Sequence, residues 1–310
     1  MPTTNTATKV AYKAESAYAS GNGSTIHAMT AFGAGDVASL TVMNDPAEDV
    51  KGGFPKVDRF SFHPVGKGTN YKVVWIKGIK YDTFEYTHYI QNSTWMSAAI
   101  QGSNGSIPTS YAFHFETMGV AGAADAFDVF GCVLVEYKLI LNTKEDYPTE
   151  KLTFIYYGMK DSVAVTSLDT VDLTQPSVHN DCTLSLDGHS MEGLATSTTL
   201  TIKNNLLGES EPNVAARYYR IDPYMNDRDI DLEVDFITDS ASILGDTLFN
   251  NGTATALRNL TGIISNGKAA LTLTNLYSDE DNVGEIPKTL DFYKPHILLK
   301  SGGDVVLSVA

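Results

Sequence analysis

Four carboxylates occupy every second position of one segment, at Asp229, Asp231, Glu233 and Asp235. Successive side chains of a β-strand point to opposite faces, so these four would share one face and the apolar residues between them the other. A row of like charges is costly to bury, and we therefore expect this face to meet water. A channel wall would use such acids to repel phosphate, whereas on an outer surface they would only favour solubility.

Other residues that commonly do chemistry are not arranged for it. The sequence contains no G-x-S-x-G, H-E-x-x-H, G-x-x-x-x-G-K-S/T or G-x-G-x-x-G motif. The seven histidines are scattered without the spacing of a metal site. The acidic run from Ser278 to Asn282 lacks the register of a calcium loop, and we interpret it as a solvated hairpin turn. The sequence therefore predicts no enzyme, no metal and no cofactor.

Composition narrows the class of protein further. The 310 residues include 22 Lys and Arg against 37 Asp and Glu, a net charge of −15 that opposes clamping of nucleic acid. Neither a secretory signal after Met1 nor a run of about 20 apolar residues is visible, so we expect a chain that is soluble when made. Cys132 and Cys182 are too few for a disulfide scaffold, and whether they pair stays open.

Alternating, β-branched and aromatic segments predict a mainly β protein. Residues 71–90 would form two strands or one long strand with a bulge at Gly78, and residues 108–117 a half-buried strand. The other expected strands are residues 132–142 and 150–158, which form a long-looped hairpin, and residues 196–205, 228–238, 267–276, 289–300 and 304–310. One short helix is expected at residues 241–251, between a Ser or Asp cap and an Asn-Gly stop.

Residues 160–195 have the composition of a linker or an edge-strand region. We therefore predict a first β domain over residues 1–165 and a second over residues 166–310. The two halves share a pattern, an Asn at the end of one strand followed by a second alternating strand, and this leaves an internal duplication open.

Three groups of segments together resemble the longer tail tube proteins of tailed viruses, either phages or archaeal viruses. The first is KVAYKAESAYAS at residues 9–20, similar to a short N-terminal arm motif of that family. The second is PTSYAFHFETMG followed by FGCVLVEYKLILNTKEDYPTEKLTFIYYG, similar to its Gly-Cys block and strand pair. The third is STTLTIKNNL followed by RDIDLEVDF, similar to its Asn-containing strand and the long wall strand after it.

The resemblance implies β-sandwich or half-barrel domains whose strands join neighbouring subunits into a closed ring barrel. Such rings would stack into a hollow tube for genome passage, located in the virion tail after assembly in the host cytoplasm. We predict that Asp229, Asp231, Glu233 and Asp235 line the channel of this tube. The implied partners are further copies of this chain, other tail proteins and passing viral DNA that is not bound specifically. Three chains would give a ring with pseudo-six-fold symmetry if both halves are tube domains, and otherwise six chains are needed.

Candidate contacts between subunits come from the arm motif and from the aromatic segment at residues 71–90. They are Tyr12, Glu15, Tyr18, Trp75 and Tyr86. Aromatic residues on both faces of a strand would promote aggregation at a free edge, so burial between subunits or in the core of one chain would protect them. We also expect residues 9–20 or 304–309 to contact another subunit, and a chain that lacks residues 1–20 to remain a compact monomer.

A second class of function is compatible with the same sequence. The Thr, Ser and Asn residues of its loops and its 16 tyrosines would also suit a virion-surface or cell-surface β-sandwich module that binds glycans or host receptors.

Overall fold

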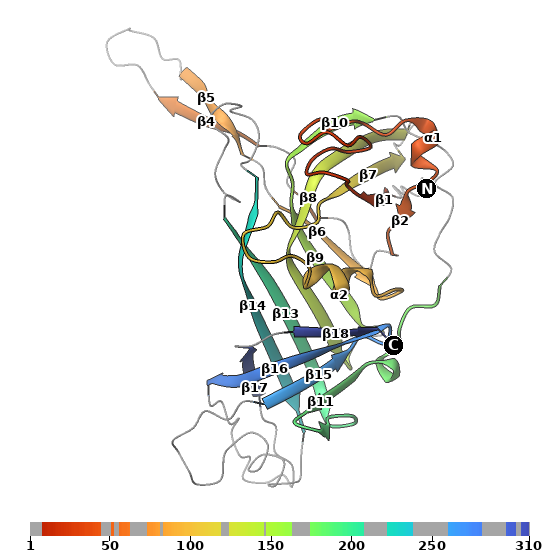
Figure 1. Cartoon of the computed structure of the whole chain (residues 1–310), viewed down its shortest axis with the longest axis vertical. Helices are drawn as coiled ribbons and strands as arrows, with labels where there is room; N and C mark the ends of the chain where they lie inside the picture. Colours follow the sequence, from red (N-terminus) through yellow and green to blue (C-terminus); the bar gives the residue numbers. More distant parts are fainter. Residues whose placement is uncertain are drawn as a thin grey trace, which may run out of the picture.

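The computed structural model confirms that the chain is mainly β, in an antiparallel sheet, with few helices (Figure 1). It describes residues 8–44, 51–52, 56–62, 73–80, 83–118, 124–145, 147–162, 174–207, 222–237, 260–280, 296–301 and 305–309. Within these residues the largest sheet has 16 strands, in the order β12-β11-β15-β16-β17-β14-β13-β8-β7-β1-β2 with branches through β10, β18, β9, β6 and β3. The described strands of this sheet do not close into a barrel.

Strand β8 (Ala124–Asn142) is the longest element and belongs to two parts of the sheet. Its first half pairs with β7 (Tyr111–Met118) and β10 (Gly158–Ser162). Its second half pairs with β9 (Thr149–Ile155) and β13 (Ala195–Leu207). The change of partners allows one strand to connect the upper and the middle parts of the molecule in Figure 1.

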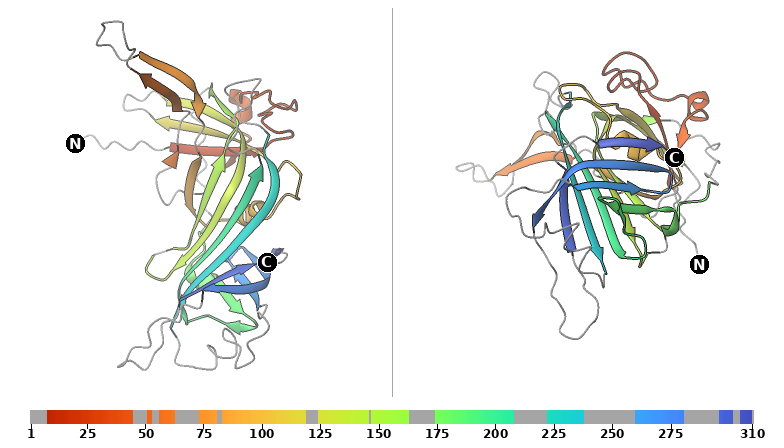
Figure 2. Two further views of the ribbon diagram at one scale, coloured as in Figure 1. Left: turned by 90° about the vertical axis from the view of Figure 1, so that its left-hand side faces the viewer. Right: turned by 60° about the horizontal axis from the view of Figure 1, so that its bottom comes forward.

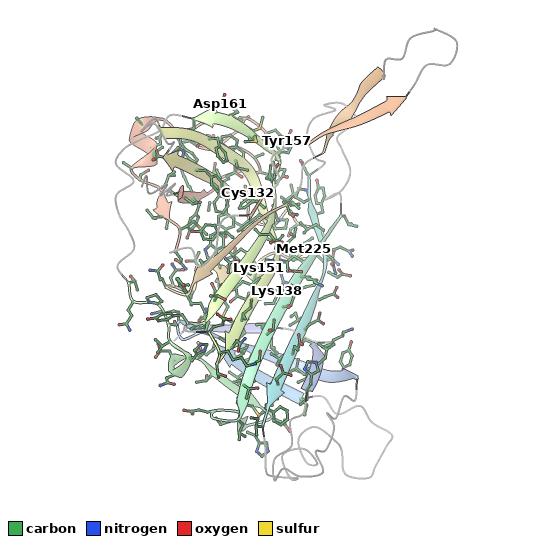
Figure 3. The ribbon with its side chains drawn as sticks, turned by 180° about the vertical axis from the view of Figure 1, so that it is seen from behind. Cys132, Lys138, Lys151, Tyr157, Asp161 and Met225 are labelled. Carbon is green, nitrogen blue, oxygen red and sulfur yellow. The ribbon has the colours of Figure 1, made fainter. Side chains whose placement is uncertain are left out.

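Gly131 lies where β8 changes partners, and its φ of +65° is open to glycine but strained for other residues. A Cβ at this position would lie 2.6 Å from Cβ of Tyr157 and 3.0 Å from Cβ of Ala19. Cys132 and Tyr157 mark this region in Figure 3. The glycine therefore permits both the positive φ in β8 and the close approach of the segments that contain Ala19 and Tyr157.

The middle of the molecule is a wall of long strands. Strand β14 (Tyr224–Phe236) pairs with β13 along its length and with β17 (His296–Ser301) along Asp231–Asp235. On the other side of β8, β9 pairs with β6 (Phe84–Tyr89). We use the term wall for the six strands β6, β9, β8, β13, β14 and β17.

Further strands extend the sheet at each end of the wall (Figure 2). The upper ones are β1 (Thr8–Ala14), which pairs with β7 and β2 (Thr41–Val42), and the two-residue β3 (Lys51–Gly52), which pairs with β6. The lower ones are β11 (Thr183–Leu186), β12 (His189–Ser190), β15 (Leu260–Ser265), β16 (Ala269–Glu280) and β18 (Val305–Val309). Two strands, β4 (Lys56–Phe62) and β5 (Val73–Lys80), form a separate sheet of their own.

Two short α-helices and one 3-10 turn complete the described elements. Helix α1 spans Ala34–Val37, α2 spans Thr94–Ala99, and the 3-10 turn covers His179–Asp181. Trp95 of α2 is fully buried in the larger core, where its ring stacks with that of Phe113 at 6.1 Å between centroids. Helix α2 thus packs apolar side chains against the buried face of the wall.

Several sequence predictions need correction. Strand β7 is buried on both faces from Tyr111 to Glu116, not half-buried. Its aromatic residues enter the larger core, whereas Ala112 enters the smaller core and His114 and Glu116 are buried as a polar cluster. Residues 71–90 contain two strands, β5 and β6, as one of the two alternatives had it, and the pairing of β5 with β4 is irregular between Ile76 and Gly78, beside the expected bulge. Strand β16 continues to Glu280, through part of the expected turn. Strand β15 was not predicted.

Other predictions are confirmed or lie outside the described residues. The hairpin of β8 and β9, and strands β13, β14 and β18, lie where the pattern placed them. The expected helix at residues 241–251 and the domain boundary near residue 165 lie outside the described residues. The two-domain division stays a prediction, although β13 of the second half pairs directly with β8 of the first. Both cysteines are free.

Candidate assembly and channel surface

Strand β14 presents its four predicted acids on one face of the wall. Asp229 and Glu233 are exposed and Asp231 and Asp235 half-buried, whereas the alternating apolar residues are all buried, namely Ile230, Leu232, Val234 and Phe236. The predicted alternation is therefore confirmed. We call this solvent-accessible side of the wall the open face. Whether the open face lines a channel stays a prediction.

Two of the acids share a histidine on the neighbouring strand. The Asp235 carboxylate lies 2.7 Å from Nδ1 of His296, and the Glu233 carboxylate lies 3.6 Å from its Nε2. At the other end of the row, the Asn205 amide donates to the Asp229 carboxylate at 2.8 Å. All of these groups are accessible to solvent, so the contacts position the carboxylates at little energetic gain.

The open face also carries lysines that the sequence pattern did not predict there. Lys138 and Lys151 are directly opposite each other on β8 and β9, near the middle of the wall (Figure 3). Each has a carboxylate partner, Glu136 at 3.1 Å from Lys138 and Glu85 at 2.8 Å from Lys151. Glu136 and Lys138 are two residues apart, so the sequence could have placed them on one face of a strand. The contact of Lys151 with Glu85 joins two strands and cannot be inferred from neighbouring positions in the sequence.

The strand register defines which charged residues share the open face. Asp229 is opposite Lys203, which is opposite Glu136, and Asp231 lies between Lys300 and Thr201. Among the described residues the open face holds seven carboxylates and four amines: Asp227, Asp229, Asp231, Glu233, Asp235, Glu136 and Glu85, with Lys138, Lys151, Lys203 and Lys300. Lys138, Lys151 and Lys203 lie near Glu136 and Glu85, and Lys300 is opposite Asp231 on β17. The β14 side nevertheless holds more acids than amines.

The candidate inter-subunit residues are mostly buried within the chain. Tyr12, Tyr18 and Tyr86 are each at most 7% exposed. The Tyr86 hydroxyl donates to the backbone carbonyl of Asn44 at 2.8 Å. The fold accounts for these three residues without a second chain, and their predicted role between subunits stays untested. Trp75 lies in β5, and its side chain is outside the part that the structure describes.

Glu15 has a clear role inside the chain. Its carboxylate accepts hydrogen bonds from the backbone N–H of Gly21 at 2.8 Å and of Gly131 at 3.1 Å. Burial raises the pKa of Glu15, and the hydrogen bonds counteract that effect. The side chain thus connects the loop after β1 to Gly131 in β8. Glu15 and Gly131 are 116 positions apart in the sequence, so only the tertiary structure reveals this contact.

A buried polar cluster connects the wall to the lower strands. Glu150 of β9 accepts hydrogen bonds from the Tyr137 hydroxyl and from the Asn266 amide, both at 2.7 Å. Its second oxygen lies 3.6 Å from Nε2 of His88, and neither of those two atoms has a hydrogen-bond partner. Burial raises the pKa of Glu150 to about 7 and lowers the pKa of His88 to about 4.

A second buried cluster surrounds His114 of β7. Its Nδ1 lies 2.6 Å from the Asp128 carboxylate and its Nε2 lies 3.1 Å from the Glu116 carboxylate. Burial lowers the pKa of His114, but the two carboxylates outweigh burial and raise it above its usual value. The other Asp128 oxygen accepts the Phe32 N–H at 2.9 Å. These groups resemble the parts of a catalytic triad, but they are buried and no hydroxyl or thiol nucleophile is bonded to His114 by any described contact.

The described residues lack two other kinds of feature. They contain no group of three or more His, Cys, Asp or Glu side chains that could hold a metal ion. Nor does any described helix have the length and apolar character needed to cross a membrane.

No protein-family model matches the sequence, and the search of curated proteins found no significant match.

Proposed function

We propose that this chain is the major tail tube subunit of a tailed virus, which assembles as stacked rings into a hollow tube for genome passage. The observation that carries the proposal is the open face: a polar, water-accessible surface of long strands with four carboxylates in line on β14. The resemblance of residues 9–20, 108–158 and 196–236 to tail tube proteins supports the same function.

Electrostatics favour a passage over a binding surface for DNA. A wall that conducts duplex DNA must not hold its phosphates, and carboxylates in excess of amines raise the energy of phosphate close to the wall. Lys138 and Lys151 have carboxylates within 3.1 Å, so their charges are largely offset at the wall itself. The β14 side of the open face would repel DNA most strongly.

Unpaired strand edges favour assembly with further copies. Strand β14 pairs with β13 on one side, but on the other side β17 covers only Asp231–Asp235. Near the beginning of β14, Met225 exchanges backbone hydrogen bonds with residues 105 and 106. The described strands leave the outer edge from Asn226 to Ile230 without a strand partner. Pairing with a neighbouring subunit would satisfy these backbone groups and continue the wall around a ring.

Negative-stain electron microscopy of the purified chain tests the proposal. Hollow rings or tubes are the expected result, because ring closure would bury the edges of the wall. Dispersed monomers across a range of protein and salt concentrations would reject the tube and favour the surface module that binds glycans or host receptors.

A further inference from the structure

The loop between α2 and β7 covers the beginning of strand β14. In this loop the backbone N–H of Gly105 donates to the Met225 carbonyl at 2.7 Å, and the Met225 N–H donates to the Ser106 carbonyl at 2.9 Å. Met225, at this edge of the wall, is labelled in Figure 3. We use the term cover loop for residues 101–107, because they occupy the edge of β14 as a short strand partner would.

Further contacts of the cover loop lie at the surface. Arg228 of β14 donates from Nη2 to the Gln101 carbonyl at 2.9 Å. Within the loop, the Ser106 hydroxyl donates to the Ser103 carbonyl at 2.6 Å and accepts the Ser103 N–H at 3.1 Å. Residues 101–105 are all exposed. Segments held by exposed hydrogen bonds open at low cost, so the cover loop can detach from β14 while the core stays folded.

Asn104 of the cover loop is followed by a glycine, Gly105, and Asn is a chemically labile residue. Glycine has no side chain to hinder its nitrogen and little restriction of its backbone. Its nitrogen can form a bond to Cγ of the preceding Asn and give up its proton to hydroxide. The bond from Cγ to the side-chain nitrogen then breaks, and this nitrogen takes a proton from water and leaves as ammonia. Water opens the resulting succinimide to aspartate or isoaspartate.

Docking of the cover loop on β14 opposes this reaction. The Gly105 nitrogen that must attack is the one whose N–H donates to the Met225 carbonyl, and that bond holds both its proton and its position. Asn104 itself is exposed, and among the described residues no hydrogen bond restrains its side-chain amide. Water therefore has access to the amide, and detachment of the loop is the step that frees the nucleophile.

Two other Asn-Gly pairs of the described chain are restrained at the side chain as well. Asn266 is fully buried, and its amide donates to the Glu150 carboxylate at 2.7 Å. Asn22 is half-buried, and its side-chain oxygen accepts a hydrogen bond from the Lys13 ammonium at 3.1 Å. Of these three pairs, the one in the cover loop is thus restrained only through its backbone.

We propose that Asn104 is a site of spontaneous deamidation and that docking of the cover loop on β14 controls its rate. The reacting state is the detached loop, so the rate scales with the fraction of chains in which the loop is open. Isoaspartate lengthens the main chain by one carbon, which displaces the Gly105 nitrogen from its position beside Met225. The modification therefore uncovers the edge of β14 next to residues 226–230. This inference is independent of the proposed function.

The ratio of the reaction rates in the native and the unfolded chain tests the proposal. The full chain is incubated at mildly alkaline pH with and without guanidinium chloride, and peptide mass spectrometry measures aspartate and isoaspartate at each Asn-Gly pair. We expect Asn104 to react about 10- to 100-fold more slowly in the native chain, the protection that two hydrogen bonds of a surface loop provide. Asn266 should be protected more than about 1,000-fold, because only global unfolding frees it.

Two variants loosen the cover loop without a change at the reacting residues. Arg228→Gln shortens the side chain that donates to the loop, and Ser106→Ala removes the hydroxyl that braces its turn. The matched control is Ser39→Ala, which removes a serine hydroxyl that donates to a backbone carbonyl at 2.7 Å in another exposed turn. Each loop variant should lose about 3- to 10-fold of the protection at Asn104, and the control should retain it. Circular dichroism confirms that each variant is folded.

Every outcome bears on the proposal. Equal rates in the native and the unfolded chain, or protection that both loop variants leave intact, contradict control by the cover loop. Protection at Asn104 as strong as at Asn266 in every variant shows that Asn104 is not a modification site. The reacted chain, separated by ion exchange, gives a second measurement, since its Met225 N–H should exchange hydrogen faster than in the unreacted chain. Unchanged exchange would show that the edge of β14 stays covered.

Discussion

Gly131 shows how one residue determines the path of the longest strand. An alanine here would adopt φ near +65° and place its Cβ 2.6 Å from Cβ of Tyr157. We expect Gly131→Ala to lower the free energy of unfolding by about 3 kcal/mol, because backbone strain and overpacking add. Urea unfolding followed by fluorescence measures the change.

Gly105 provides the matched control for that substitution. Its φ is +79°, but a Cβ there would meet nothing within 4 Å. Gly105→Ala should therefore cost only about 1 kcal/mol, from backbone strain alone. Equal losses at the two glycines would contradict the role of close packing at Gly131.

Glu150 and His88 have opposite linkages to pH. The raised pKa of Glu150, about 7 against an ordinary value of 4.5, stabilises the fold below pH 4.5, and that stability is lost as pH rises to 7. The lowered pKa of His88, about 4 against 6.5, gives stability that is present above pH 6.5 and lost as pH falls to 4. In the original chain the two effects nearly cancel between pH 4.5 and 6.5.

Single substitutions should separate these two linkages. Relative to the original chain, His88→Gln should lose about 3 kcal/mol of additional stability between pH 4.5 and 7 as pH rises, since Glu150 then titrates alone. Glu150→Gln should lose a similar amount as pH falls from 6.5 to 4. Denaturant unfolding at several pH values measures both slopes, and slopes of the same sign would contradict this account of the pair.

At the scale of elements, β1 is an integral part of the subunit. It pairs with both β7 and β2, and Val10, Ala11 and Tyr12 are buried in the two cores. This revises the expectation that a chain without residues 1–20 remains a compact monomer. Removal of residues 1–14 would expose core surface and an edge of β7, at a cost of about 5 kcal/mol, comparable with the whole stability of many domains.

Limited proteolysis and thermal unfolding measure that loss. A chain without residues 1–7 retains β1 and serves as the control, which we expect to unfold like the full chain. Cooperative unfolding at an unchanged temperature after removal of residues 1–14 would show that β1 is dispensable.

The charge of β14 determines how the open face responds to DNA. Substitution of Asp229, Asp231, Glu233 and Asp235 by Lys would leave three carboxylates and eight amines among the described residues of this face. We expect folding to persist, because these side chains are accessible, and duplex DNA to bind in a salt-dependent manner. In an assembled virion the same change should slow genome ejection.

Fluorescence anisotropy with a labelled duplex measures this binding. The matched control introduces four lysines at acids elsewhere, the exposed Glu145, Asp161 and Glu192 and the half-buried Asp36, which changes the net charge equally. If the control binds DNA as tightly as the β14 variant, net charge rather than the open face determines affinity.

At the scale of the whole molecule, the number of chains in a ring follows from how the halves contribute to the wall. Strands β6, β8 and β9 come from the first half, and β13, β14 and β17 from the second. Because both halves contribute strands to the wall, we expect a ring of three chains with pseudo-six-fold symmetry. The acids of β14 occur only in the second half of each chain and would make the two halves unequal. The mass of a ring gives the number of 33.6 kDa chains directly. A strict six-fold axis with six chains would contradict this expectation.

The sequence by itself determined the β class and the alternation of β14. Alternation has a period of two residues, so neighbouring side chains are enough to assign Asp231 and Leu232 to opposite faces. The same local signal located β9 and β13 to within a few residues, but of β8 it found only the second half, because the strand already begins at Ala124.

Only the tertiary structure decided what covers each face and which buried groups meet. His114 reads as a polar position of a half-buried strand, but it is buried because Asp128 and Glu116 satisfy both of its ring nitrogens. Glu150 contacts Asn266, which lies 116 residues further along the chain. Burial of a second face and pairing of buried charges depend on segments brought together from distant positions, and local periodicity carries no information about them.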